Sequence, residues 1–208
     1  MLDARNLKTK IKITKAHVEC PVLNCQEMVA RQRRTFKKEP VFQCPAHKIY
    51  ISPSTFEYPD EKDNLLWSDK NDMNLLASIR KFKRESRMAR DNSEDALTWN
   101  VFRYLHKEGY LESFLAFVSN LRVSDSELIY WSYSQVANGT WPLLTDARIQ
   151  FGEQPNRSSE PDLIAVTPEA LFFIENKLTA NNATVPSSQA NQKAYTSGEN
   201  EWYRRVFN

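Results

Sequence analysis

The sequence predicts a mixed α/β fold of the α+β kind, preceded by a small zinc-binding unit. Three observations support this prediction. All three cysteines are clustered near the N-terminus, helix-type apolar spacing follows in the middle of the chain, and strand-like apolar runs come last. The chain has 208 residues, of which 41% are hydrophobic, so it has enough apolar side chains to form a buried core.

The N-terminal unit is predicted to be a zinc-ribbon-like module. Its two ligand pairs, Cys20-x4-Cys25 and Cys44-x2-His47, are separated by 18 residues and supply four nitrogen and sulfur ligands, which suits tetrahedral Zn²⁺. A unit this small would need its metal to fold. His17 is a competing fourth ligand, and the alternative to a metal site is three unligated thiols in an intracellular protein.

Charge is distributed unevenly between the two halves of the chain. Residues 1–90 contain 19 Lys and Arg against 11 Asp and Glu, whereas residues 91–208 contain 9 against 15. The basic half is expected to follow a phosphate backbone, and the acidic half to concentrate metal-binding carboxylates. The basic residues between the two ligand pairs are predicted to bind nucleic acid: Arg31, Arg33, Arg34, Lys37 and Lys38. A merely solvated loop is the alternative.

Three domains are predicted along the chain: a basic zinc module in residues 1–60, a helical connector in residues 61–90 and a catalytic domain in residues 91–208. The connector lacks glycine and proline and has apolar residues at helical spacing. A helix is predicted within residues 91–109, where polar residues offer N-caps and a glycine ends the segment. A further helix is predicted for residues 111–121.

Strands are predicted in residues 127–133, which are aromatic and β-branched, and twice within residues 159–178. The two apolar runs of the latter segment flank Pro168, which favours a turn because proline presets φ for the first central residue. The segment therefore predicts a β-hairpin.

Pairing about this turn would place Asp162 opposite Glu175 and Glu160 opposite Lys177. Since side chains alternate along a strand, Asp162, Glu175 and Lys177 would point to one face, with the Cβ atoms of the two acids about 5 Å apart. The alternative is an ordinary surface ladder of ion pairs among Glu160, Glu175 and Lys177, worth about 0 to 1 kcal/mol.

Two directly opposed carboxylates destabilise a hairpin unless a cation lies between them. Mg²⁺, or Mn²⁺ in its place, fits because it prefers oxygen ligands and retains waters and substrate phosphate oxygens. Asp162 and Glu175 are the predicted ligands of this catalytic ion. Lys177 would orient or deprotonate a water and stabilise charge on a phosphate, so the pattern predicts phosphodiester hydrolysis.

The letters "PD" at Pro161–Asp162 and "ENK" at Glu175–Lys177 resemble the motif of the PD-(D/E)XK nuclease superfamily. The resemblance implies a restriction-endonuclease-like core, in which helices flank a central mixed sheet, and Mg²⁺-dependent cleavage of DNA or sometimes RNA. It also implies that a glutamate on the first helix joins the metal site, and Glu94 stands at that place. The alternative for Glu94 is the N3 position of a capping box that starts at Asp91.

The chain departs from the superfamily pattern after this motif. The polar residues of the following helix do not have the usual spacing, and only 31 residues follow Lys177. The core is therefore expected either to close atypically or to be truncated at its C-terminus.

The expected function is Mg²⁺-dependent, endonuclease-like hydrolysis of nucleic acid, with DNA preferred, in which the zinc module docks the substrate. The alternative is a non-catalytic zinc-dependent factor that binds nucleic acid or protein. No signal peptide and no run of about 18 apolar residues is present, so the expected location is the cytoplasm, with no membrane partner. A homodimer is compatible with the sequence, which shows no interface signature.

Overall fold

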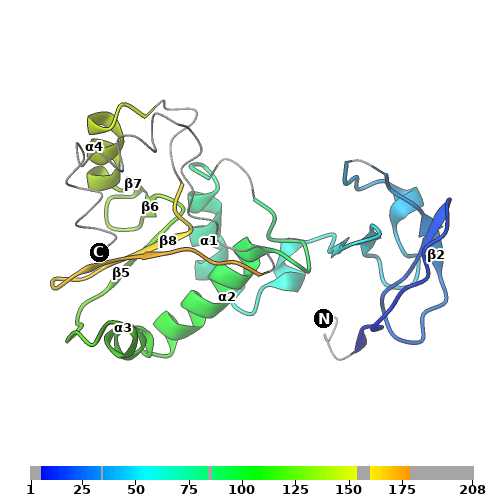
Figure 1. Cartoon of the computed structure of the whole chain (residues 1–208), viewed down its shortest axis with the longest axis horizontal. Coiled ribbons are helices and arrows are strands. Elements are labelled where there is room, and N and C mark those ends of the chain that lie inside the picture. The colour runs from blue at the N-terminus through cyan, green and yellow to red at the C-terminus, as the bar shows by residue number, and fades with distance from the viewer. Residues whose placement is uncertain (1–5, 34, 84–85, 154–159, 179–208) are drawn as a thin grey trace, which may run out of the picture. The chain divides into compact units, whose positions relative to one another are not determined.

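The computed structural model describes residues 6–33, 35–83, 86–153 and 160–178 (Figure 1). The chain divides into two units, Met1–Asn176 and Lys177–Asn208. All described helices and strands belong to the first unit. In the second unit, the described residues are Lys177 and Leu178.

Two short antiparallel hairpins form the N-terminal part. β1 (His17–Glu19) pairs with β2 (Met28–Ala30), and β3 (Tyr50–Ile51) pairs with β4 (Phe56–Glu57), with the 3-10 turn η2 (Pro40–Phe42) between them. Strands of two or three residues bury little apolar surface, so their core is small. It includes the three cysteines and consists of Val18, Cys20, Val22, Cys25, Val29, Cys44, Ile49, Ile51, Phe56 and Tyr58.

The connector forms the 3-10 helix η3 (Glu61–Asn64) and the helix α1 (Lys70–Ile79). The Asp69 side chain caps α1 by accepting hydrogen bonds from the first backbone N–H groups of the helix. The apolar side of α1 is buried through Leu75, Leu76 and Ile79.

The connector is less helical than its sequence suggests, because α1 ends at Ile79. The Asn64 side chain donates hydrogen bonds to the backbone carbonyls of Met88 (2.7 Å) and Arg90 (2.6 Å). These bonds tie the segment after α1 to the segment before it, and this tertiary contact accompanies the irregular path of the connector beyond Ile79.

The two predicted helices that follow are present as α2 (Glu94–Lys107) and α3 (Leu111–Ser119). The Ser93 side chain accepts a hydrogen bond from the Ala96 backbone N–H and so caps α2. Gly109 has φ +71°, the left-handed conformation that commonly ends a helix. The sequence signals at both ends of α2 are therefore correct.

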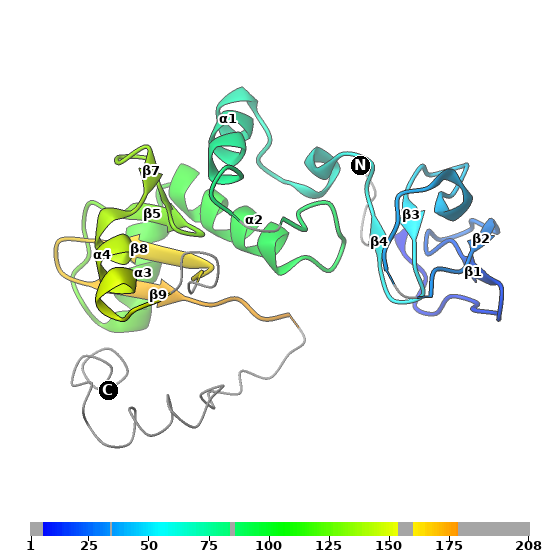
Figure 2. The same ribbon diagram turned by 90° about the horizontal axis from the view of Figure 1, so that it is seen from above.

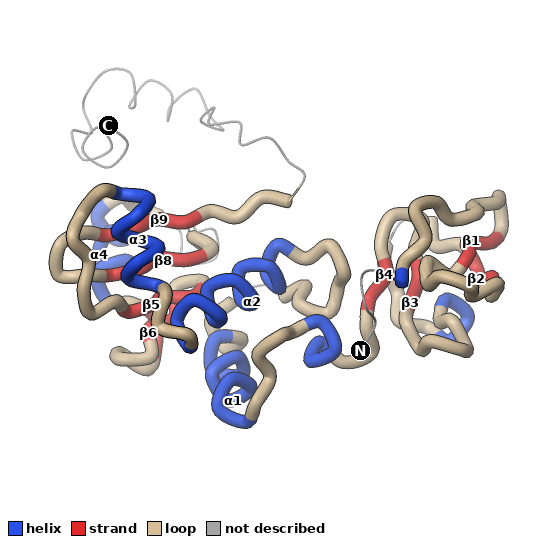
Figure 3. The backbone as a smooth tube through the Cα atoms, turned by 90° about the horizontal axis from the view of Figure 1, so that it is seen from below, coloured by secondary structure: helices blue, strands red, loops and turns tan. Residues whose placement is uncertain are grey.

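The main sheet has the strand order β7-β6-β5-β8-β9 (Figure 3), with every pairing antiparallel. The strands are β5 (Glu127–Tyr130), β6 (Tyr133–Ser134), β7 (Gly139–Thr140), β8 (Leu163–Val166) and β9 (Leu171–Ile174). The mixed sheet of the predicted core is thus not present among the described strands. Tight turns join β5 to β6 and β8 to β9, and such turns reverse the chain direction.

Helices cover both faces of this sheet. α2 and α3 lie on one face and α4 (Pro142–Gln150) lies on the other (Figures 1 and 2). On the first face, Trp99 of α2 and Leu115 of α3 belong to the same buried cluster as Leu163 of β8. On the second face, Trp141 packs with the buried residues Ile129 and Ile164. Successive side chains of β5 and β8 point to opposite faces of the sheet, so these two strands contribute buried residues to both faces.

β6, β7 and α4 were not predicted from the sequence. The chain turns between β5 and β6 at Trp131 (φ +45°) and Ser132 (φ +80°). Neither residue is the glycine or asparagine that usually marks such a turn in a sequence.

No helix in the described part of the chain is long and apolar enough to cross a membrane.

Candidate functional sites

The four predicted zinc ligands converge in space. The ligand atoms of Cys20, Cys25, Cys44 and His47 all lie within 4.8 Å of one another. His47 Nδ1 is 3.7 Å from Cys20 Sγ and 3.6 Å from Cys44 Sγ, and the Sγ atoms of Cys25 and Cys44 are 3.9 Å apart. Tetrahedral zinc, with Zn–S about 2.3 Å and Zn–N about 2.0 Å, separates its ligand atoms by about 3.5 to 3.8 Å. The cluster could therefore hold a structural zinc ion.

Two turns with left-handed residues aim these ligands inward. In the first turn, the Cys25 N–H donates to the Val22 carbonyl (3.1 Å) and Asn24 has φ +64°. In the second, the Lys48 N–H donates to the Cys44 carbonyl (2.8 Å) and Lys48 itself has φ +59°. The first turn thus reverses the chain between Cys20 and Cys25, and the second reverses it from Cys44 to the residue after His47.

The fourth ligand is His47 and not His17. Along β1, Val18 and Cys20 are buried, whereas His17 is exposed and does not belong to the cluster. The strand alternates its side chains between two faces, so His17 and Cys20 cannot both point toward the same centre.

Lys8 supports the metal cluster and was not found by the sequence analysis. Its Nζ atom donates hydrogen bonds to the carbonyl of Cys20 (3.0 Å), to the carbonyl of Cys25 and to Glu19 Oε1 (2.7 Å). The bond from Lys8 lowers the pKa of the Glu19 carboxyl. Three thiolates around Zn²⁺ would leave one net negative charge, which the Lys8 ammonium would offset.

Burial raises the pKa of the Cys20 thiol. A buried thiolate is unfavourable without a nearby cation, because the low-dielectric interior disfavours the charged form. Zn²⁺ supplies that cation and deprotonates the thiols that bind it. The cluster is thus chemically suited to a metal ion and poorly suited to free thiolates.

The predicted nucleic-acid-binding residues have different surroundings. Lys37 forms an ion pair with Glu39 (3.3 Å between Nζ and Oε1), and Lys38 forms one with Glu57 (2.7 Å). Arg34 lies outside the described residues. The two lysines therefore have acidic partners within the protein.

Arg31 and Arg33, in contrast, line a cavity of about 950 Å³. The Arg31 guanidinium donates a hydrogen bond to the Thr14 carbonyl (3.0 Å), which holds the side chain across the surface of the module. Both arginines are exposed, so they are available to a ligand.

The hairpin has the register that the sequence predicts. Leu163 is paired with Ile174, and continuing this register by one residue puts Asp162 opposite Glu175. Both acids lie immediately outside the paired strands, at the open end of the hairpin. Asp162 is half-buried and Glu175 is exposed.

A chain of hydrogen bonds connects this open end to the first turns of α2. The Asn176 backbone N–H donates to Asp162 Oδ2 (2.9 Å), and Asn176 Nδ2 donates to Thr98 Oγ1 (2.8 Å). The buried Thr98 hydroxyl donates in turn to the backbone carbonyl of Glu94 (2.9 Å). Asn176 is the middle residue of the Glu-x-Lys motif, a position that the motif leaves open to any residue.

Glu94 is the first residue of α2 after the Ser93 cap. The capping box that would start at Asp91 and place Glu94 at N3 is therefore wrong. The Asp91 carboxylate instead accepts a hydrogen bond from the Phe56 backbone N–H (3.2 Å).

Glu94 lines a second cavity, of about 730 Å³. This cavity is lined by three acidic and three basic residues: Glu94, Asp95, Glu160, Lys83, Arg87 and Arg90. Asp162 and Glu175 are not among its lining residues.

Glu160 pairs with Lys83, a residue that the sequence analysis did not select. The Lys83 Nζ atom is 3.7 Å from Glu160 Oε2 and 3.1 Å from Asp95 Oδ1, and it lies 4.5 Å from the centre of the Trp131 ring. Lys177, the predicted neighbour of Glu160, is exposed and belongs to the second unit of the chain.

Among the described residues, the Cys and His cluster is the only group that brings together three or more His, Cys, Asp or Glu side chains at metal-binding distance. The structure thus assembles the whole predicted zinc site. For the predicted magnesium site, it places Asp162 and Glu175 opposite each other by register and links Asp162 to the helix that carries Glu94.

Comparisons with protein-family models, with curated proteins and with solved structures found no match to this chain.

Proposed function

We propose that this protein is a Mg²⁺-dependent nuclease, in which a zinc-stabilised N-terminal module binds the nucleic acid. Asp162 and Glu175 hold the catalytic ion, Lys177 acts on the attacking water, and Glu94 completes or tunes the metal site. The proposal rests on the resemblance of the Pro-Asp and Glu-x-Lys motifs to the PD-(D/E)XK superfamily and on the placement of those motifs in the fold.

The observation that carries the proposal is the hairpin register. Continued by one residue beyond the paired strands, this register would bring two acids opposite each other, where a cation would relieve the repulsion of like charges. The hydrogen bonds from Asn176 to Asp162 and to Thr98 fix this end against α2. A nuclease site needs such a fixed carboxylate, because a catalytic group must be held in position before the substrate binds.

The residues fit the ion that the proposal requires. Two carboxylates offer the oxygen ligands that Mg²⁺ prefers and leave positions for water and phosphate. A bound Mg²⁺ would polarise the phosphodiester and favour deprotonation of the attacking water. Lys177 would orient that water and stabilise the charge that develops on the phosphate oxygens, while the Asn176 N–H keeps the Asp162 carboxylate oriented.

The test of the proposal is cleavage of labelled single-stranded DNA, duplex DNA and RNA, with Mg²⁺ or Mn²⁺ and without divalent ions. The variants Asp162→Ala and Lys177→Ala are expected to lower the metal-dependent cleavage rate by at least about 100-fold and to leave nucleic-acid binding nearly unchanged. Binding is measured separately, by fluorescence anisotropy without divalent ions.

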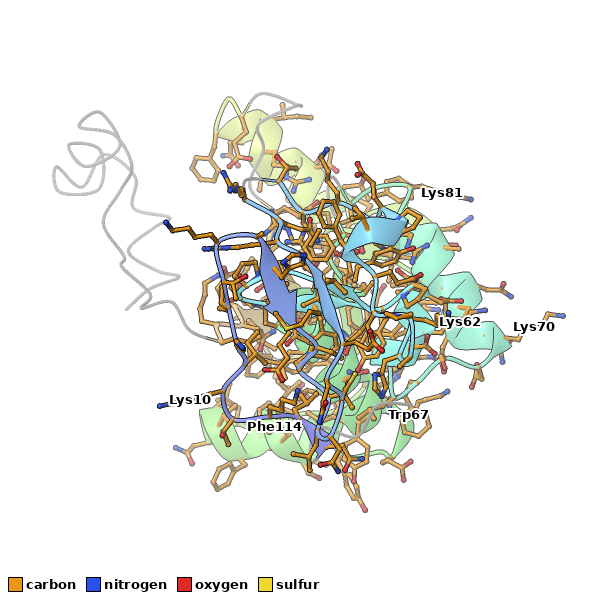
Figure 4. The ribbon with its side chains drawn as sticks, turned by 90° about the vertical axis from the view of Figure 1, so that its right-hand side faces the viewer. Lys10, Lys62, Trp67, Lys70, Lys81 and Phe114 are labelled. Carbon is orange, nitrogen blue, oxygen red and sulfur yellow. The ribbon has the colours of Figure 1, made fainter. Side chains whose placement is uncertain are left out.

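Matched controls are available on the same molecule. Glu169→Ala removes an exposed carboxylate from the turn of the same hairpin, and Lys70→Ala removes a lysine that projects away from the ribbon (Figure 4). Both controls are expected to cleave at the wild-type rate. Wild-type cleavage by folded Asp162→Ala protein with a full zinc content would show that Asp162 is not catalytic.

A non-catalytic, zinc-dependent binding factor is the second candidate function. It is favoured by one observation, namely that only the Cys and His cluster gathers three or more ligands among the described residues. This candidate predicts nucleic-acid or protein binding with no metal-dependent cleavage, and only small stability effects of Asp162→Ala and Lys177→Ala.

A further inference from the structure

The cavity beside the zinc module is strongly basic. Among the described residues, its lining contains five cationic side chains and no acidic one; the cations are Lys15, Arg31, Arg33, Arg87 and Arg90. Such a concentration of one sign of charge in a concave surface raises the local concentration of anions. The cavity is therefore suited to a polyanion and not to a cationic or neutral ligand.

This basic cavity adjoins the cavity that contains Glu94 and Glu160. The two share four lining residues, which are Ser54, Thr55, Arg87 and Arg90. Arginines from the loop of the zinc module thus line one of two adjoining cavities, and the candidate catalytic glutamate lines the other.

Part of the basic lining is held in place by other contacts. Arg90 Nε donates to Glu57 Oε2 (3.1 Å), and its guanidinium lies 5.0 Å from the centre of the Phe36 ring. Arg31 is held by its bond to Thr14. Guanidinium groups that are already positioned lose less conformational entropy when they bind phosphate.

We propose that the backbone of a nucleic acid follows these two adjoining cavities, from Arg33 across Arg87 toward Glu94. This inference deepens the proposed function and rests on it. It adds Lys15, Arg87 and Arg90 to the phosphate-binding surface. Lys37 and Lys38 are left outside this surface, because they are not among the residues that line the cavity.

The positions of the five basic residues in the cavity indicate which kind of anion it would bind. The cations come from segments far apart in sequence and line a cavity of about 950 Å³, so they suit a repeating phosphate chain better than a single phosphate ion. The guanidinium groups recognise phosphate oxygens and carry no base-specific information.

The test compares two double variants that each remove two positive charges. The affinity for labelled single-stranded DNA, duplex DNA and RNA is measured by fluorescence anisotropy over a series of salt concentrations. Arg33→Ala combined with Arg87→Ala is expected to weaken binding by about 10-fold or more and to reduce the slope of log affinity against log salt by about two. The probe that shows this loss identifies the kind of backbone that the cavities take.

The control variant combines Lys37→Ala with Lys38→Ala. It removes the same charge from the same basic loop, but outside the cavity, so binding is expected to stay within about threefold of the wild type. Zinc content and circular dichroism establish that both variants are folded. Equal weakening by the two double variants would show that binding depends on general charge and would overturn the proposed path, as would absence of binding to all three probes.

The same variants separate this inference from the proposed nuclease activity. If Asp162→Ala cleaves normally while the Arg33 and Arg87 double variant loses binding, the catalytic assignment fails and the path stands. If Asp162→Ala abolishes cleavage while the double variant binds normally, the path fails and the catalytic assignment stands.

Discussion

His17 and His47 are each three residues from a cysteine, yet only His47 belongs to the candidate metal cluster. His47 follows Cys44 within a turn, so its ring remains on the side of the cysteine sulfur. His17 precedes Cys20 on a strand, where three residues move a side chain to the opposite face. For a single residue, the local backbone conformation therefore decides between two histidines at the same spacing.

At this scale we predict that His47→Ala loses zinc and that His17→Ala does not. The first variant removes one of four tetrahedral ligands, whereas the second removes an exposed imidazole outside the cluster. Metal analysis of the purified variants, after dialysis against a weak chelator, measures the difference. About one zinc ion per chain is expected for His17→Ala, and the reverse result would exclude His47 as the ligand.

At the scale of the elements, the helix α2 and the hairpin β8–β9 are joined where the candidate catalytic residues lie. The Asn176 side chain reaches Thr98 on α2, while its backbone N–H holds Asp162. The opposite end of the hairpin is held differently, through Glu169, which accepts a hydrogen bond from the Ser124 hydroxyl (3.1 Å). The hairpin is thus anchored at both ends, but only one end carries candidate catalytic residues.

We predict that Asn176→Ala lowers the free energy of unfolding by about 1 kcal/mol, because it removes one side-chain hydrogen bond. Thr98→Val is expected to lower it by about 2 kcal/mol, because it removes both the bond from Asn176 and the bond to the Glu94 carbonyl. Cleavage is expected to fall by about 10-fold or more, since loss of the tie lets the Asp162 end of the hairpin shift relative to α2. Chemical denaturation and the cleavage assay measure the two effects.

Ser124→Ala is the matched control for this prediction, because it removes a hydrogen bond at the other end of the same hairpin. It is expected to retain wild-type cleavage. The double variant of Asn176 and Thr98 tests the contact itself: if the two residues act through one shared bond, the double variant loses little more stability than Thr98→Val alone. Full additivity would contradict the proposed tie.

At the scale of the whole molecule, two hydrophobic cores share no residues. One is built around the metal cluster, and the other is built from α1, α2, α3 and the main sheet. All four described α-helices lie outside the metal-binding part. The backbone N–H of Tyr58, at the edge of the first core, donates to the Ala89 carbonyl (2.9 Å). The first core contains the candidate zinc ligands and would gain stability from a bound metal ion, whereas the second rests on apolar burial alone.

We predict that removal of zinc by a strong chelator unfolds the first core and leaves most of the helical signal in place. The metal supplies folding free energy only to the part that binds it. Differential scanning calorimetry should show that the unfolding transition of the first core is lost. Far-UV circular dichroism should show that the helical signal is retained, and adding zinc back should not increase it. A single cooperative loss of all helix would contradict the independence of the two cores.

The sequence by itself determined the features that depend on neighbouring residues. These include the paired zinc ligands, the two ends of α2 and the register of the hairpin, because ligand spacing, capping and strand alternation are local. Only the tertiary structure decided the path of the chain after α1 and which basic residues line the cavity. Those outcomes depend on how distant segments come together, as when Asn64 binds the Met88 carbonyl or when Arg33 and Arg87 line one cavity, and such arrangements leave no periodic signal in the chain.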